Sequence, residues 1–278
     1  MGIFDLFRKA PCISTDEVRA YIRDKAPSEY CLVDVRQPSE YQHGHLPGAR
    51  LIPLGQLRQN ISGISPDRTI IVYCRTGSRS NAAATLLLAS GLKNVLNMSG
   101  GIIRYNGIVA SGPPEAGMFC FPENLGPGQL LAVACYVEEG TGSFLGQIST
   151  GALSSQGAAA VASLAGDKKD HKERLRQLYR SITGQSPEKN FPAGVIELPE
   201  DPVMVGCVKV ADALRWAKDR SATDILEMLM SLSANAYDLY LKLGRMVNSE
   251  EARRIFEVLA EEEHANIDRI ARVFEGTL

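Results

Sequence analysis

The chain has 278 residues, of which 45% are hydrophobic, and its formal net charge is −2. A chain of this length favours two domains, because a single hydrophobic core seldom grows so large. Charges of both signs are spread along the chain and give no basic field, so we expect no nucleic-acid partner. The longest apolar run is shorter than the ~20 residues of a membrane span, and the first residues lack the apolar core of a secretory signal. We therefore expect a cytoplasmic protein that does not contact a membrane.

Residues 1–110 alternate short apolar runs with amphipathic segments, a pattern that predicts a parallel α/β sheet with flanking helices. The apolar runs have the length and composition of strands and lie at residues 31–35, 50–54, 69–74 and 94–98. The segments with helical spacing lie at residues 16–24 and 80–90. Gly and Pro then accumulate over residues 111–127, which indicates a linker between two domains.

Residues 128–278 show helical spacing over lengths that strands do not reach. The long helical segments lie at residues 128–149, 156–183, 221–247 and 249–276. This pattern predicts an all-α domain, an antiparallel four-helix bundle. A long connection with a short helical segment at residues 210–219 separates the second helix from the third, and such a crossover occurs in ferritin-like bundles.

Cys74 ends the third predicted strand and begins a short turn before the helix at residues 80–90. The turn, which we expect to bind the substrate, consists of Arg75, Thr76, Gly77, Ser78, Arg79 and Ser80. Successive backbone N–H groups in such a turn, together with the positive end of the following helix, stabilise an anion. The thiol of Cys74 should therefore have a lowered pKa and act as a nucleophile, helped by the two guanidinium groups. Gly77 permits the tight turn, and the small Ser and Thr side chains leave room for a second sulfur atom.

Three sequence segments resemble the successive signatures of the rhodanese family: DVRQPSEYQHGHLPGARLIPL, IVYCRTGSRS and GLKNVLNMSGGIIRYNG. The resemblance implies a sulfurtransferase that moves sulfane sulfur from a small-molecule donor such as thiosulfate, through a Cys74 persulfide, to a thiol or to cyanide. The resemblance also implies that this sulfur transfer requires no cofactor. It also implies that Asp34, Arg36 and Glu40 organise the structure around the loop, and that residues 44–48 form a turn. Tyr105 stands where the family usually has Trp, which is a conservative departure.

Two other functions of the cysteine loop remain open. Phosphatases of related fold have a loop longer by one residue, with an Arg six positions after the cysteine, whereas Ser80 occupies that position here and Arg79 comes one step earlier. The shorter loop favours sulfur over phosphate. Cys74 could instead be inert, in a non-catalytic module that senses sulfur or stress. We expect His43 and His45 to be turn residues with no chemical role. No other sequence feature supplies a His and acid partner for Cys74, so we expect the loop itself to activate the thiol.

The segments ANAYDLYLKL and LAEEEHANIDRI resemble the ferritin-like, rubrerythrin-type superfamily. The resemblance implies a pair of metal ions, held by one Glu from each of two helices and a Glu-x-x-His pair from each of the other two. The apolar stripes place Glu138, His171, Glu261 and His264 on inward faces. At the remaining inward positions, where the family has Glu, this chain has Lys168 and Ser233. The di-metal site is therefore expected to be degraded.

Three interpretations of these helix residues are open. In the first, the ammonium of Lys168 replaces the metal charge and forms a metal-free ion-pair network, because unpaired buried carboxylates are costly. In the second, a single iron or zinc ion is bound by Glu138, His171, Glu261 and His264 while Lys168 turns aside. In the third, the polar residues are simply exposed, as charge runs usually are.

The role of the helical domain is also open. It could form a homodimer, shield the loop or receive sulfur, or it could be an active metal oxidase in a redox or peroxide-handling protein. The six cysteines, at positions 12, 31, 74, 120, 135 and 207, lack the paired spacing of a zinc site or a disulfide framework. Cys120 in the linker is either a relay thiol or an ordinary packing residue.

Overall fold

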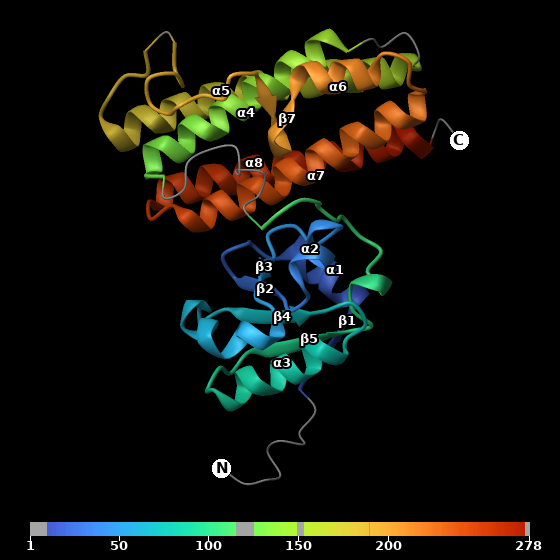
Figure 1. Cartoon of the computed structure of the whole chain (residues 1–278), viewed down its shortest axis with the longest axis vertical. Helices are drawn as coiled ribbons and strands as arrows, with labels where there is room; N and C mark the ends of the chain where they lie inside the picture. Colours follow the sequence, from blue (N-terminus) through green and yellow to red (C-terminus); the bar gives the residue numbers. More distant parts are fainter. Residues whose placement is uncertain (1–9, 115–124, 149–152, 189, 276–278) are drawn as a thin grey trace. The chain divides into compact units, whose positions relative to one another are not determined.

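The computed structural model describes residues 10–114, 125–148, 153–188 and 190–275. The chain divides into two compact units, Met1–Pro114 and Glu115–Leu278 (Figure 1). The first unit is an α/β domain and the second is largely helical.

A five-stranded parallel sheet forms the centre of the first unit. Its strands are β1 (Cys12–Ser14), β2 (Tyr30–Asp34), β3 (Arg50–Leu51), β4 (Thr69–Tyr73) and β5 (Val95–Ser99), in the order β1-β5-β4-β2-β3. The central strand β4 is buried from Ile70 to Tyr73, which accounts for its continuous apolar run. Two strands differ from the prediction. β1 was not predicted, and β3 ends at Leu51, since Pro53 has no N–H to donate and precedes the 3₁₀ helix η2 (Leu54–Gly63).

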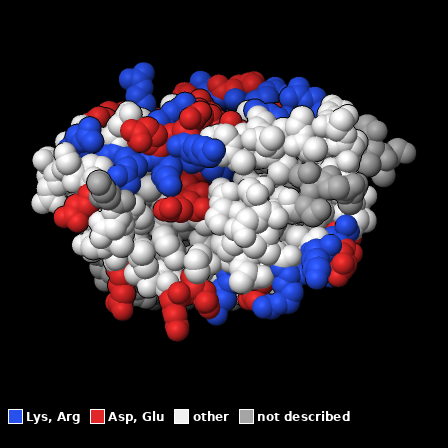
Figure 2. All heavy atoms as spheres, turned by 90° about the horizontal axis from the view of Figure 1, so that it is seen from above, with Lys and Arg blue, Asp and Glu red and all other residues white. Residues whose placement is uncertain are grey.

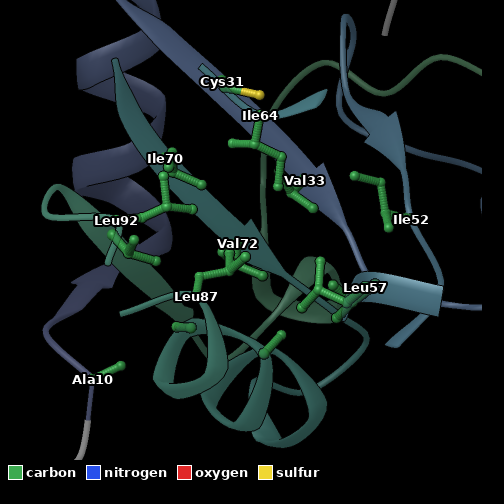
Figure 3. Close-up of a cluster of buried hydrophobic side chains, with 14 of the residues drawn as sticks. Ala10, Cys31, Val33, Ile52, Leu57, Ile64, Ile70, Val72, Leu87 and Leu92 are labelled. Carbon is green, nitrogen blue, oxygen red and sulfur yellow. The ribbon is translucent and has the colours of Figure 1, made fainter. Parts of the chain in front are cut away.

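Helices cover both faces of this sheet (Figure 1). They are α1 (Thr15–Asp24), α2 (Pro38–Gln42) and α3 (Ser78–Ala89). On one face, Ile70 and Val72 of β4 pack with Leu87 of α3 and Leu57 of η2 (Figure 3). The alternate residues of β4 point to the other face, because side chains of a strand alternate between its two sides.

The second face of the sheet carries the other hydrophobic core of this unit. Ile71 and Tyr73 of β4 pack there with Val18 of α1 and Tyr41 of α2. The hydroxyl of Tyr41 donates to the carbonyl of Ala49 at 2.8 Å, which satisfies its polar end inside the core. The two cores hold β4 rigidly up to the residue that precedes Cys74.

Long helices make up most of the described part of the second unit. They are α4 (Pro127–Gln147), α5 (Ser155–Thr183), α7 (Ala222–Met246) and α8 (Glu250–Glu275), at nearly the predicted bounds. α4 packs against α5, α7 packs against α8, and α5 also packs against α8. The expectation of a helical second domain is thereby confirmed.

The crossover between α5 and α7 contains a small antiparallel pair that the sequence did not predict. It consists of β6 (Val203–Met204), η4 (Val205–Cys207) and β7 (Val208–Lys209), followed by α6 (Val210–Ala217). Strands of two residues are too short to show a periodicity. β6 lies against α4 at Gly140, where a Cβ atom would be 2.0 Å from the carbonyl oxygen of Val203. A glycine in the helix thus permits the close approach of the crossover.

The cysteines of the described residues differ in their bonding state. Cys12, Cys31, Cys74 and Cys135 are free, whereas Cys207 is disulfide-bonded, which the cysteine spacing did not indicate. Cys120 lies outside the described residues, so its relay role stays a prediction.

Acidic and basic side chains are interspersed on the face drawn in Figure 2 rather than separated by sign. None of the described helices combines the length and apolar content needed to cross a bilayer.

A buried ion pair lies at the C-terminal end of β2 in the first unit. The guanidinium of Arg36 binds the carboxylate of Asp34 through contacts of 2.7 and 2.9 Å, and it also donates to the carbonyl of Gly44 at 2.6 Å. The side chains of Arg36 and Asp34 are 6% and 0% exposed. The pair therefore links the end of β2 to the segment after α2, and the charges of Arg36 and Asp34 compensate each other.

Replacing Arg36 by Met should destabilise the first unit by about 3–5 kcal/mol, because Asp34 would stay buried without its cation. Hydrogen exchange of the sheet amides, followed by mass spectrometry, measures this loss separately from the helical unit. Arg23→Met is the control, since Arg23 pairs with Asp24 at the surface and should change little. Equal protection of the sheet in Arg36→Met and in the unchanged chain would contradict the expectation.

Candidate functional site: the Cys74 loop and a buried charged cluster

Cys74 directly follows β4 and lies at the floor of the loop that leads into α3. Only 1% of the residue is exposed. The backbone N–H of Gly77 donates to its Sγ at 3.1 Å, and the hydroxyl of Ser80 lies 3.5 Å from the same atom. Arg75, Thr76 and Ser78 are exposed around it. The loop therefore surrounds the sulfur with donors and presents polar groups to solvent.

Opposing effects act on the pKa of the Cys74 thiol. Burial raises this pKa, because the charged form loses water. The hydroxyl of Ser80 and the backbone N–H groups of Ser80, Gly77 and Thr76 lower it, and their combined effect prevails, so the pKa of Cys74 lies below its usual value. A larger fraction of the residue is thus thiolate near neutral pH, as a nucleophile requires.

Arg79 is fixed beside the loop by Glu40. Two guanidinium nitrogens of Arg79 donate to the two carboxylate oxygens of Glu40, both at 2.7 Å. This hydrogen bonding lowers the pKa of Glu40 to about 2, against the smaller opposite effect of burial. The paired guanidinium, whose own pKa is raised by Glu40 and to a lesser extent by Cys74, remains a fixed positive charge near the sulfur.

The segment after β5 holds the backbone of the cysteine loop from the other side. The N–H groups of Ile102 and Ile103 donate to the carbonyls of Cys74 and Arg75, at 2.9 and 3.2 Å. Gly101 makes this approach possible, because a Cβ atom there would lie 2.4 Å from the carbonyl of Arg75. Its φ of 63° and ψ of −172° are also accessible essentially only to glycine. The loop geometry therefore depends on this glycine as much as on the loop itself.

Asn97 of β5 is a contributor that the sequence analysis missed. Its side chain is buried, and its Oδ1 accepts from the hydroxyl of Ser80 at 2.6 Å. A hydroxyl has a single hydrogen, so Ser80 can serve either Asn97 or the sulfur of Cys74 at one time. The pattern of a strand does not distinguish an inward Asn that orients a hydroxyl from one that merely interrupts the apolar run, so no sequence signal marked it.

A second polar cluster lies inside the helical unit. The Nζ of Lys168 on α5 lies 3.2 Å from Oε1 of Glu138 on α4 and also contacts Oε1 of Glu263 on α8. The ring of His171 lies 3.1 Å from Glu138 through Nδ1, and the hydroxyl of Tyr240 on α7 donates to Glu138. All these side chains are buried. Four helices thus contribute one group or more to a single charged cluster.

The structure corrects the prediction for α8. Glu261 is exposed, and the side chain of His264 is 32% exposed and packs edge-on against Tyr237, so neither enters the cluster. Glu263 and Asn266 are the buried polar residues of this helix instead. Residues two apart on a helix face nearly opposite directions, and the run of three glutamates concealed which of them faces inward. The prediction of Glu261 and His264 as a ligand pair is therefore wrong.

The other predicted positions of the helical unit do face inward. Glu138, Lys168, His171 and Ser233 are all buried, so the interpretation in which they are solvated is wrong for these residues. Ser233 lines a small cavity together with Thr141 and Lys168, and the rest of its lining is leucine.

The charged groups of the cluster favour one another's ionised forms. Burial opposes ionisation of Glu138, but Lys168 and His171 outweigh it and hold the pKa of Glu138 below its usual value. Burial likewise opposes the ammonium of Lys168, but Glu138 and Glu263 prevail and raise its pKa. The pKa of His171 is raised in the same way, with Glu138 overcoming the effect of burial. The cluster is thus a network of mutually compensated charges.

These residues do not fit a two-ion metal centre. Glu138, His171 and Glu263 offer ligand atoms within 4.8 Å of one another, which is one small group of donors. A pair of ions shared by Glu residues needs twice the carboxylates, and Lys168 and Ser233 supply none. The ammonium of Lys168 is moreover in contact with the carboxylates of Glu138 and Glu263.

The described geometry of the first unit defines a class of protein: a parallel α/β domain with a buried cysteine in a strand-to-helix loop of hydrogen-bond donors. The model of the Rhodanese-like domain matches residues 14–107. A protein called Sulfurtransferase in Allochromatium vinosum is 40% identical over 74 residues, which cover 27% of this chain and 69% of that protein. Thiosulfate sulfurtransferase PspE of Escherichia coli is 39% identical over 70 residues, which cover 24% of this chain and 67% of PspE.

Solved structures match the same kind of domain. A rhodanese-related protein of Thermoplasma volcanium is 28% identical, and the match covers 36% of this chain and 97% of that chain with a TM-score of 0.33. The match to the uncharacterized protein YqhL of Bacillus subtilis, 41% identical over 76 residues, spans 27% of this chain and 60% of that relative. Through residues 14–107, this chain belongs to the rhodanese-like family.

Replacing Ser80 by Ala should raise the pKa of Cys74, because the side-chain donor to the thiolate is lost while the backbone donors remain. A full hydrogen bond to a charged group contributes about 1.5–3 kcal/mol. Because Asn97 shares the single hydrogen of this hydroxyl, the loss should be smaller, and the thiolate fraction near neutral pH should fall by less than about tenfold. The pH dependence of iodoacetamide alkylation at Cys74 measures this, and its midpoint should move to higher pH. Ser90→Ala removes an exposed hydroxyl at the other end of α3, where Ser90 is the C-terminal cap, and is the control.

Replacing Gly101 by Ala should abolish the reactivity of Cys74, because the added Cβ displaces the backbone at Arg75. Gly91→Ala is a matched control, since Gly91 also has a positive φ, of 97°, but has no atom within 4 Å of the added Cβ. Both variants bear the backbone strain of about 1–3 kcal/mol, and only the first adds the clash. Equal alkylation rates in the two variants would show that the loop does not depend on this packing.

Proposed function

We propose that the chain is a sulfurtransferase that carries sulfane sulfur as a persulfide on Cys74. The thiolate of Cys74 attacks the outer sulfur of thiosulfate, the sulfur–sulfur bond of the donor breaks, and sulfite leaves with the bonding electron pair. A thiolate or cyanide acceptor then attacks the outer sulfur of the persulfide. The new bond forms to the acceptor while the bond within the persulfide breaks and returns the electrons to Cys74.

The observation that carries this proposal is the set of donors converging on Cys74. Backbone N–H groups, the hydroxyl of Ser80 and the start of α3 stabilise negative charge on the sulfur. The same charge must return to this sulfur each time the acceptor removes the outer atom. The loop therefore supports both halves of the transfer, and it needs no His partner to do so.

The state of Arg79 supports sulfur rather than phosphate chemistry. A phosphatase needs a guanidinium that is free to bind two oxygens of the phosphoryl group. Arg79 already uses two nitrogens on Glu40, and the sixth position after the cysteine is Ser80, whose hydroxyl lies by the sulfur. The similar proteins of Allochromatium vinosum and Escherichia coli are both named sulfurtransferases, which supports the same choice.

The helical unit is proposed to have a ferritin-like arrangement that has lost its metal chemistry. Two helical hairpins, α4 with α5 and α7 with α8, joined by a long crossover, support this arrangement. The donor set around Glu138 gives no support to a peroxide-handling metal oxidase, so we do not favour that alternative. Thiosulfate as donor and a thiol or cyanide as acceptor are the substrates by which the proposal is tested.

Replacing Cys74 by Ser should abolish thiosulfate-to-cyanide transfer, because a hydroxyl neither ionises near neutral pH nor accepts sulfane sulfur. Thiocyanate formation measures the transfer, and intact mass spectrometry after exposure to thiosulfate should show one added sulfur atom in the unchanged chain but none in Cys74→Ser. Cys12→Ser, at an exposed free thiol, is the control and should retain both. Sulfur addition at an equal level in Cys74→Ser would overturn the proposal.

A further inference from the structure

We propose that the ammonium of Lys168 is a built-in cation that takes the place of a metal ion between Glu138 and Glu263, and that the helical unit therefore folds without metal. This inference is independent of sulfur transfer at Cys74. It concerns the three groups that could otherwise bind an ion together, Glu138, His171 and Glu263.

The position of the ammonium is the first support. Nζ of Lys168 contacts one oxygen of Glu138 and one of Glu263, which are among the ligand atoms that a cation between these helices would use. The side chains of Lys168, Glu138 and Glu263 are 5%, 1% and 0% exposed, so bulk water does not solvate these charges. Two carboxylates buried this deeply require a positive charge between them, and Lys168 supplies it from within the chain.

The surroundings of Lys168 are the second support, because a metal ion could enter only if the ammonium left. The cavity that the side chain of Lys168 lines is small, and its other lining residues are Thr141, Ser233 and leucines. An ammonium moved there would exchange two carboxylates for two hydroxyls in an otherwise apolar lining, which is strongly unfavourable. Lysine turned aside with an ion in its place is therefore the less stable arrangement.

One substitution, at position 168, would complete a set of metal ligands in this cluster. Oε2 of Glu263 and both polar atoms of the Asn266 side chain are buried and have no hydrogen-bond partner among the described residues. Asn266 lies three residues after Glu263, on the same face of α8. Likewise, position 168 lies three residues before His171 on α5. A carboxylate at position 168 would thus create a Glu-x-x-His pair facing Glu138 and Glu263.

Lys168→Glu tests the proposal, because it removes the cation and adds a ligand in one step. We expect the purified variant to bind Co²⁺ with visible d–d absorption, and we expect Zn²⁺ to raise its melting temperature by about 5 °C at a hundredfold excess over Kd. The unchanged chain should bind neither ion at this site, and EDTA should leave its melting temperature unaltered. Lys169→Glu, the same change at an exposed neighbour on α5, is the matched control and should behave like the unchanged chain.

Several results would overturn the proposal. One is a stoichiometric metal ion in the unchanged chain, purified from metal-replete cells, that is lost in Glu138→Gln. Another is a folded Lys168→Glu variant that binds no more Co²⁺ than Lys169→Glu does. If Lys168→Glu does not fold without metal, refolding that depends on added Zn²⁺ supports the proposal. The proposal would be contradicted if both Lys168→Glu and the neutral Lys168→Gln failed to fold, with Zn²⁺ as well as without it. In either variant Glu138, His171 and Glu263 remain as donors and should bind Zn²⁺ in place of the lost ammonium.

Discussion

The donation of loop hydrogens to the sulfur of Cys74 is the interaction on which the first unit depends. β4 is buried on both faces, so the strand ends at a fixed point and the loop begins there. α3 supplies its N-terminus, and the segment at Gly101 holds the loop backbone from behind. Each of these elements has an ordinary structural role, but together they aim several donors at one atom. An anionic sulfur is stable there because the fold, rather than a separate base, provides the compensating dipoles.

The helical unit solves a similar electrostatic problem by different means. Its carboxylates at Glu138 and Glu263 lie where water cannot reach them, and dipoles of the backbone are already used within the helices. Side chains must then stabilise them, and the ammonium of Lys168 carries a full positive charge to both carboxylates, beside the contacts of His171 and Tyr240 with Glu138. The two units thus illustrate two treatments of buried negative charge. One uses many partial charges from a loop, and the other uses side chains, with the ammonium of Lys168 shared by both carboxylates.

The sequence predicted those parts of the chain whose signals repeat or whose order is specific. The central strands, α3, the long helices of the second unit and the cysteine loop all have such signals. Short elements such as β1 and β6 do not, because two or three residues cannot show a period. The error at Glu261 has another origin. The sequence does not show which of the three adjacent glutamates faces the interior, and in the structure it is Glu263 that is buried. Asn97 could not be found because its role exists only across strands, through Ser80.

The pairing of Arg79 with Glu40 has a consequence for how the loop responds to acidity. The carboxyl of Glu40 has its pKa lowered to about 2, so the pair is present above the ordinary carboxyl range and breaks only as the pH falls through that low value. Over the range in which the thiol titrates, the neighbouring guanidinium therefore keeps both its charge and its orientation. The field acting on the sulfur stays constant while the sulfur itself changes state. Cys74 should accordingly titrate as a single simple acid, with no second inflection contributed by its charged neighbours.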